Sequence, residues 1–161
     1  MSAKNQNVEL EAWAKSTFTK GEARKVLLPA GFRLYKFTGG SLVDSKGQVT
    51  PWWSARTGLD SNDPGLDGVL ERSARAGVHP REHVRARAAV KNAWNNLDGI
   101  LKVRLLTAAW GWYGRARHQP VDAPDGKGGF VDYPNVVFIG GSYQLFIPNL
   151  SASDVQIDEG V

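Results

Sequence analysis

The chain has 161 residues, a formal net charge of +4, 42% hydrophobic and 22% charged residues, and no cysteine. This length predicts one domain, which buries roughly 70% of the surface that the unfolded chain exposes. The lack of cysteine excludes disulfides and thiolate zinc sites. The N-terminus is polar, with no secretory signal, and no apolar run approaches the length of a membrane span. We therefore expect a cytoplasmic protein that does not engage the membrane and whose export, if any, needs no signal peptide.

The chain divides into an N-terminal helical segment, residues 1–28, and a core, residues 29–161. Residues 8–15 are predicted to form a short helix with Trp13 facing inward. Residues 32–38 alternate apolar and polar side chains, which predicts a strand.

Residues 49–54 follow a glycine-rich loop and read as a second strand. Pro51 cannot donate a ladder hydrogen bond, so this segment is predicted to be an edge strand or the entrance of a strand. Residues 61–65 form a predicted turn that opens a helix ending near Gly77.

Residues 81–101 carry one apolar stripe at helical spacing, and we expect one long helix. The stripe consists of Ala86, Val90, Trp94, Leu97 and Leu101. The apolar residues 103–112 favour a strand, and the Pro- and Gly-rich residues 120–129 favour a surface loop.

Residues 134–148 comprise two apolar runs hinged on Gly140 and Gly141, and their composition predicts buried strand. The glycine pair lets the backbone bulge or approach a ligand closely. Gln144 is the one polar side chain with chemistry to offer in the second run. Residues 154–158 read as a short edge strand, and the order of the elements favours an α+β fold.

Familiar catalytic motifs are missing from the sequence. His79 and His83 have helical spacing but no HExxH pattern around them, so we expect no metal. Neither a GxSxG nucleophile turn nor a glycine-rich phosphate loop is present. Residues 72–117 hold eight Arg and two Lys against two acids, which is typical either of an anion-binding region or of a solvated helix face.

Three short segments, residues 34–36, 50–54 and 142–148, resemble the ADP-ribosyltransferase toxin family in order and spacing. Members of that family commonly carry Leu/Val-Tyr-Arg on a first strand, a Ser-rich edge strand and a late Glu-x-Glu followed by Val-Leu-Ile-Pro. The resemblance implies a split β-sandwich of two small mixed or antiparallel sheets with helices. It also implies that NAD binds as substrate in the cleft between the sheets.

The resemblance assigns roles residue by residue. It implies that Gln144 occupies the catalytic position and that Ser54 hydrogen-bonds the nicotinamide ribose. Arg33 or Lys36 would hold the pyrophosphate, and Trp52 or Trp53 would stack on a ring. The predicted cofactor-binding residues are Arg33, Tyr35, Lys36, Trp53, Gly140, Gly141 and Tyr143.

The sequence departs from the family at three positions. Lys36 replaces Arg, and Ser142 and Gln144 replace the two Glu. An amide still accepts a hydrogen bond from the ribose 2′-hydroxyl but supplies no charge. Opposite charges about 4 Å apart interact by about 4 kcal/mol at an effective dielectric near 20, which is roughly a thousandfold in rate. The implied activity is NAD glycohydrolase or ADP-ribosyltransferase, with a protein or nucleic acid as acceptor in the latter case, in a bacterial toxin or effector.

Two other functions fit the sequence. The basic residues 72–117 include Trp110, Trp112 and Tyr113, and interleaved cations and aromatic rings suit a nucleic-acid-binding module. An interaction or effector protein without chemistry is the other alternative.

Overall fold

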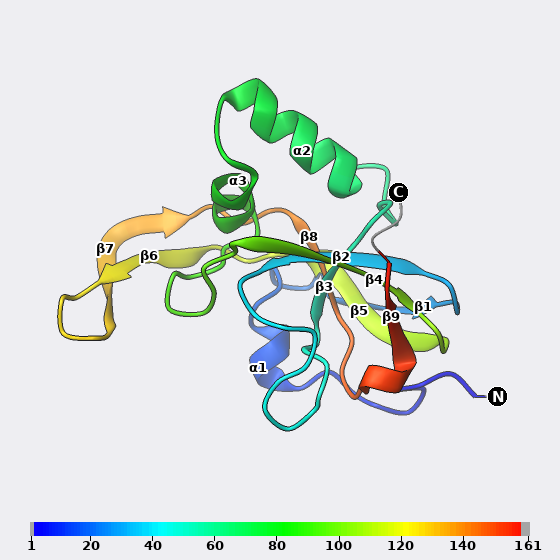
Figure 1. Cartoon of the computed structure of the whole chain (residues 1–161). Coiled ribbons are helices and arrows are strands. Elements are labelled where there is room, and N and C mark those ends of the chain that lie inside the picture. Colours follow the sequence, from blue (N-terminus) through cyan, green and yellow to red (C-terminus); the bar gives the residue numbers. More distant parts are fainter. Residues whose placement is uncertain (1, 159–161) are drawn as a thin grey trace.

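The computed structural model describes residues 2–158, except for the side chain of Pro134, and has an α+β fold with its strands in two antiparallel sheets (Figure 1). The helices are α1 (Ala12–Lys15), α2 (Gly65–Ala76), α3 (Pro80–Arg87) and the 3-10 helix η1 (Ala152–Asp154). The strands are β1 (Arg24–Leu28), β2 (Arg33–Thr38), β3 (Trp52–Ala55), β4 (Gly99–Leu105), β5 (Ala109–Arg115), β6 (Gln119–Pro124), β7 (Phe130–Phe138), β8 (Tyr143–Phe146) and β9 (Val155–Ile157).

The larger sheet has seven strands in the order β1-β5-β8-β3-β2-β4-β9. Strand β3 lies in its middle, so the expected edge position was wrong. The alternative of a strand entrance is confirmed, because Pro51 directly precedes β3. Strands β2 and β3 pair only through Leu34 with Ala55 and Tyr35 with Ser54. Beyond Tyr35 they separate, since β2 continues along β4 while β3 continues along β8.

Three clusters of buried side chains hold the fold together. The central cluster joins both halves of the larger sheet and includes Leu34, Trp53 and Leu145. A second cluster packs α2 and α3 onto the aromatic rings of β2, and a third packs α1 against β5 and β8. Figure 1 shows α2 and α3 on one side of the sheet and α1 on the other. The sheet is therefore covered on both faces near its centre.

Strands β6 and β7 form the second sheet, a hairpin that extends away from the body of the molecule (Figure 1). The expected surface loop at residues 120–129 is instead mostly β6 and its turn. Residues 136–138 form a strand as expected, at the end of β7, but the expected burial was wrong, because Val136, Val137 and Ile139 are more than half exposed. Among the described strands β7 pairs only with β6, and most of its apolar side chains are about half exposed. In the second run, Leu145, Phe146 and Ile147 are buried as expected.

The long helix expected over residues 81–101 was also wrong, because α3 ends at Arg87. The amide of Gly140 donates to the carbonyl of Ala86 at 2.9 Å, and that of Ser142 donates to the carbonyl of Arg87 at 2.9 Å. These tertiary bonds take the carbonyls that a longer helix would use. Ala89 then adopts a left-handed conformation with φ 53°, which ends the helix.

The segment between α3 and β4 is a loop held by two buried charges. The guanidinium of Arg85 donates to the carbonyls of Val90 and Asn95 at 3.1 and 3.0 Å. The carboxylate of Asp122, on β6, accepts from the backbone amides of Asn92 and Ala93 at 2.6 and 2.9 Å. Partners distant in the sequence therefore override the apolar periodicity of this segment.

Predictions for the remaining elements had mixed outcomes. The expected N-terminal helical segment contains only the four residues of α1 as helix and ends in strand β1. Trp13 is 54% exposed instead of facing inward. The helix ending near Gly77 is confirmed as α2, with Gly77 left-handed at φ 70°. The short edge strand at residues 154–158 is confirmed as β9.

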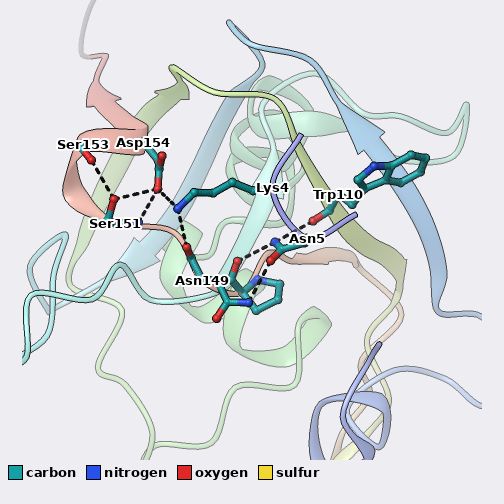
Figure 2. A network of polar contacts seen from close by, with 8 residues as sticks. Lys4, Asn5, Trp110, Asn149, Ser151, Ser153 and Asp154 are labelled. Atoms are coloured by element: carbon teal, nitrogen blue, oxygen red, sulfur yellow. Dashed lines mark hydrogen bonds and ion pairs between the residues drawn. The ribbon is translucent and has the colours of Figure 1, made fainter. Parts of the chain in front are cut away.

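A polar network fastens the N-terminal residues to the turn after β8 (Figure 2). The ammonium of Lys4 lies 2.5 Å from the carboxylate of Asp154, which also accepts from the amide and hydroxyl of Ser151. The side chain of Asn5 donates to the carbonyls of Trp110 and Pro148 at 3.1 and 2.7 Å. The network holds β5 and the turn before η1 in place.

Candidate functional site

A cleft of about 430 Å³ opens where β2 and β3 separate. Its walls come from β2, β3, β8, α2, α3 and the loop after α3. Six of the nine predicted site residues line it, namely Tyr35, Lys36, Trp53, Ser54, Tyr143 and Gln144. The cleft thus gathers side chains from segments about a hundred residues apart in the chain.

Gln144 lies on β8, and its Nε2 atom donates to the backbone carbonyl of Thr17 at 3.1 Å. A carbonyl only accepts, so this bond fixes the orientation of the amide. The Oε1 atom then faces away from Thr17 and remains a hydrogen-bond acceptor. Residue 144 can orient a ligand hydroxyl, but it adds no negative charge.

Lys36 lies on β2 at the point where the strands separate. Its ammonium donates to the hydroxyl of Thr50 at 2.7 Å and lies 5.2 Å from the centre of the Trp53 ring. Burial lowers the pKa of Lys36 to about 8, because a low-dielectric surrounding disfavours the charged form. The side chain is still mostly protonated at neutral pH and places a positive charge in the cleft wall.

Tyr35 and Ser54 face each other across the last paired positions of β2 and β3. Burial and the nearby charge of Asp63 raise the pKa of Tyr35 to about 12, while a hydrogen bond with Ser54 opposes the change. The phenol is therefore neutral at physiological pH. The hydroxyl of Ser54 is held at the floor of the cleft.

Asp63 is a cleft residue that sequence reasoning missed. The hydroxyl of Tyr113 donates to its Oδ2 at 2.6 Å, and the amide of Gly65 donates to its Oδ1 at 3.1 Å. Burial raises the pKa of Asp63. The ring of Tyr143 stacks on Tyr113 with centroids 5.0 Å apart. The sequence showed Asp63 only as part of a turn, and its contact with Tyr113 spans fifty residues.

Two exposed indole rings stand at the cleft. Trp94 and Trp13 line it and are 55% and 54% exposed. Of the two residues predicted to stack, Trp53 is only 2% exposed and its indole donates to the carbonyl of Thr50. Trp52 also lines the cleft and is partly exposed, so the indole rings exposed for stacking belong to Trp13, Trp52 and Trp94. Sequence reasoning missed Trp94 because its spacing placed it on the stripe of a long helix.

Three predicted site residues do not line this cleft. The guanidinium of Arg33 pairs with Asp158 at 2.8 Å, beyond strand β4. Gly140 adopts φ 72°, and a Cβ there would lie 2.6 Å from the carbonyl oxygen of Ala116, so its role is to let the backbone pack closely. Gly141 lies beside a second, adjoining cavity.

Within the described residues, no three His, Asp or Glu side chains come together as a metal site. The ring of His79 accepts from the amide of Arg81 and caps α3. Over the same part of the chain, no helix has the length and apolar character to cross a membrane. Two rings considered for nucleic-acid stacking, Trp112 and Tyr113, are buried.

Comparison of the chain with protein-family models, curated proteins and solved structures found no match.

Proposed function

We propose that the protein binds NAD in the cleft between β2 and β3 and hydrolyses it at the nicotinamide–ribose bond, on a split β-sandwich of the ADP-ribosyltransferase type. One observation carries the proposal. Residue pairs 35–36, 53–54 and 143–144, far apart in the sequence, meet in one cleft at the position where the larger sheet divides. The three segments are those on which the family resemblance was based.

The lining of the cleft suits the chemical parts of such a ligand. Its volume, about 430 Å³, is within the range of small-molecule sites. Trp94 and Trp13 offer stacking faces for an aromatic ring. The hydroxyl of Ser54 and the Oε1 atom of Gln144 offer polar contacts to ribose hydroxyls.

Hydrolysis is the reaction that an amide at position 144 suits best. A water oxygen bonds to C1′ of the ribose as the C1′–N bond breaks, nicotinamide leaves as a neutral molecule, and the water releases a proton. Gln144 would orient the 2′-hydroxyl through Oε1. It cannot offset the positive charge that develops on the ribose, which slows the cleavage whatever the acceptor, and an amide cannot take a proton from a protein or nucleic-acid acceptor.

The test is nicotinamide release from NAD, followed by chromatography, for the natural sequence, Gln144→Ala and Gln156→Ala. Gln156 is a matched control because it lies exposed on β9 and contacts Arg104 instead of the cleft. We expect release by the natural protein and by Gln156→Ala, and a loss of a hundredfold or more for Gln144→Ala.

A thermal shift separates binding from catalysis. NAD at 100 times its Kd stabilises a folded protein by about 2.7 kcal/mol, which is several degrees for a domain of this size. If NAD raises the melting temperature but no nicotinamide is released, the protein binds NAD and does not hydrolyse it. If NAD causes no thermal shift and no nicotinamide is released, the proposal is refuted. That result would favour an interaction protein without chemistry.

A further inference from the structure

A second cavity of about 340 Å³ adjoins the cleft. Helices α2 and α3 and the turn before β8 form its walls. It shares Pro64, Val69, His83, Ser142 and Tyr143 with the main cleft. A ligand in the main cleft can therefore extend into this cavity without leaving the protein surface.

Two arginines line this cavity, Arg72 from α2 and Arg87 from α3. Neither forms an ion pair with any carboxylate of residues 2–158. Their neighbours on the same helices do, since Arg75 pairs with Glu71, and Arg81 pairs with Asp98 and Glu82. The two guanidinium groups are thus left available to an anion from solution.

The two arginines share the cavity with one imidazole, that of His83. Burial, then the charge of Arg87, then that of Arg72 lower the pKa of His83. His83 lines the cavity, so positive potential from both helices converges there. No Asp or Glu is among the described lining residues of this cavity, and the neutral hydrogen-bonding side chains of Asn62 and Ser142 complete it.

We propose that the cavity between Arg72 and Arg87 binds the pyrophosphate group of a dinucleotide whose nicotinamide half occupies the main cleft. The dinucleotide part of this inference rests on the proposed function, whereas the anion site itself does not. Arginine is suited to the task because its planar donors pair bidentately with phosphate oxygens. The site replaces the pyrophosphate contact expected of Arg33, which pairs with Asp158.

The experiment measures binding of ADP-ribose, inorganic pyrophosphate and nicotinamide riboside by calorimetry. The proteins are the natural sequence, Arg72→Gln, Arg87→Gln, the double variant and Arg75→Gln. Arg75 is the control, because it lies on α2 and pairs with Glu71 outside the cavity. We expect ADP-ribose and pyrophosphate to bind at least tenfold more weakly to each single variant and at least a hundredfold more weakly to the double variant. Arg75→Gln should bind as the natural protein does.

The three ligands separate the two proposals. Nicotinamide riboside has no phosphate, so its affinity should be the same in all five proteins. Pyrophosphate binding that depends on Arg72 and Arg87, without ADP-ribose binding, would retain the anion site and overturn its assignment to a dinucleotide. ADP-ribose binding that is equal in the double variant and the natural protein would overturn the anion site while leaving the proposed function intact. Circular dichroism of each variant checks that it is folded.

Discussion

Replacement of Lys36 by methionine tests whether the cleft keeps a charge at a cost to stability. The fall of the Lys36 pKa from 10.5 to about 8 means that the folded protein spends about 3 kcal/mol to keep this ammonium charged at pH 7. This cost is net of the bond to Thr50 and the contact with Trp53, because a pKa reports the sum of the interactions of the charged form. Lys36→Met removes the buried charge, so we expect a variant more stable by up to about 3 kcal/mol at pH 7.

The pH dependence gives the sharper test. Between pH 8 and 10.5 the folded protein has lost the Lys36 proton while the unfolded chain still holds it. Stability rises with pH wherever the unfolded state binds more protons. The natural protein should therefore gain about 3 kcal/mol relative to Lys36→Met over this window. The stability advantage of Lys36→Met should therefore disappear by pH 10.5. Tyrosine titration occurs in both proteins and cancels.

Urea denaturation at pH 7.5, 9 and 10.5 measures this difference, with Lys46→Met as the control. Lys46 lies exposed in the turn after Asp44, so its replacement should leave the pH dependence unchanged. A difference between Lys36→Met and the natural protein that stays constant from pH 7.5 to 10.5 would refute the burial argument. The same variant should bind ADP-ribose more weakly, which would show that the charge is kept for a ligand and not for the fold.

Three further predictions concern the close packing at Gly140, the polar network of Asp154 and the exposed ring of Trp94. Gly140→Ala should lower the free energy of unfolding by about 2 kcal/mol or more, because its Cβ would lie 2.6 Å from the Ala116 carbonyl oxygen. The control Gly126→Ala is also at positive φ but has nothing within 4 Å, so it should lower the free energy of unfolding by only about 1 kcal/mol. Equal losses for the two variants in urea denaturation would contradict the close packing at Gly140. Burial alone would raise the pKa of Asp154, but hydrogen bonds from Lys4 and the 151 turn hold it below its ordinary value of 3.8. The carboxylate therefore stabilises the fold above that pH, and the stability lost in Asp154→Asn should shrink as the pH falls below about 4, as thermal melts at pH 3 and pH 7 would show. Trp94→Ala should change stability by less than about 1 kcal/mol, since the ring is 55% exposed, while calorimetry should show weaker binding of NAD by about tenfold, the low end of one stacking contact; unchanged affinity would remove Trp94 from the site.

Local signals in the sequence were sufficient to predict those elements whose bounds depend on a few neighbouring residues. The turn at residues 61–65 and the left-handed Gly77 bound α2, and both are properties of a few neighbouring residues. Alternation was sufficient for β2, whose Leu34 and Tyr35 face two different buried clusters. The family resemblance, and not a local pattern, singled out Tyr35, Lys36, Ser54 and Gln144, which line the cleft.

Tertiary contacts decided the rest. The apolar spacing of residues 81–101 fits a helix. However, Gly140, Ser142 and Asp122 form hydrogen bonds with the backbone of this segment from far along the chain. The second half of the segment is therefore a loop, and this loop carries Trp94 to the cleft. Composition cannot show whether an apolar run such as 136–139 has a neighbouring layer to cover it. Likewise, a lysine in a strand pattern does not reveal whether its strand parts from the next one. The sequence alone indicated an α+β chain, and the family resemblance pointed to segments that line the cleft. Long-range packing alone accounts for three features of the cleft region, because each depends on residues from distant positions in the chain. They are the separation of β2 from β3, the buried charge of Lys36, and the pair of guanidinium groups of Arg72 and Arg87.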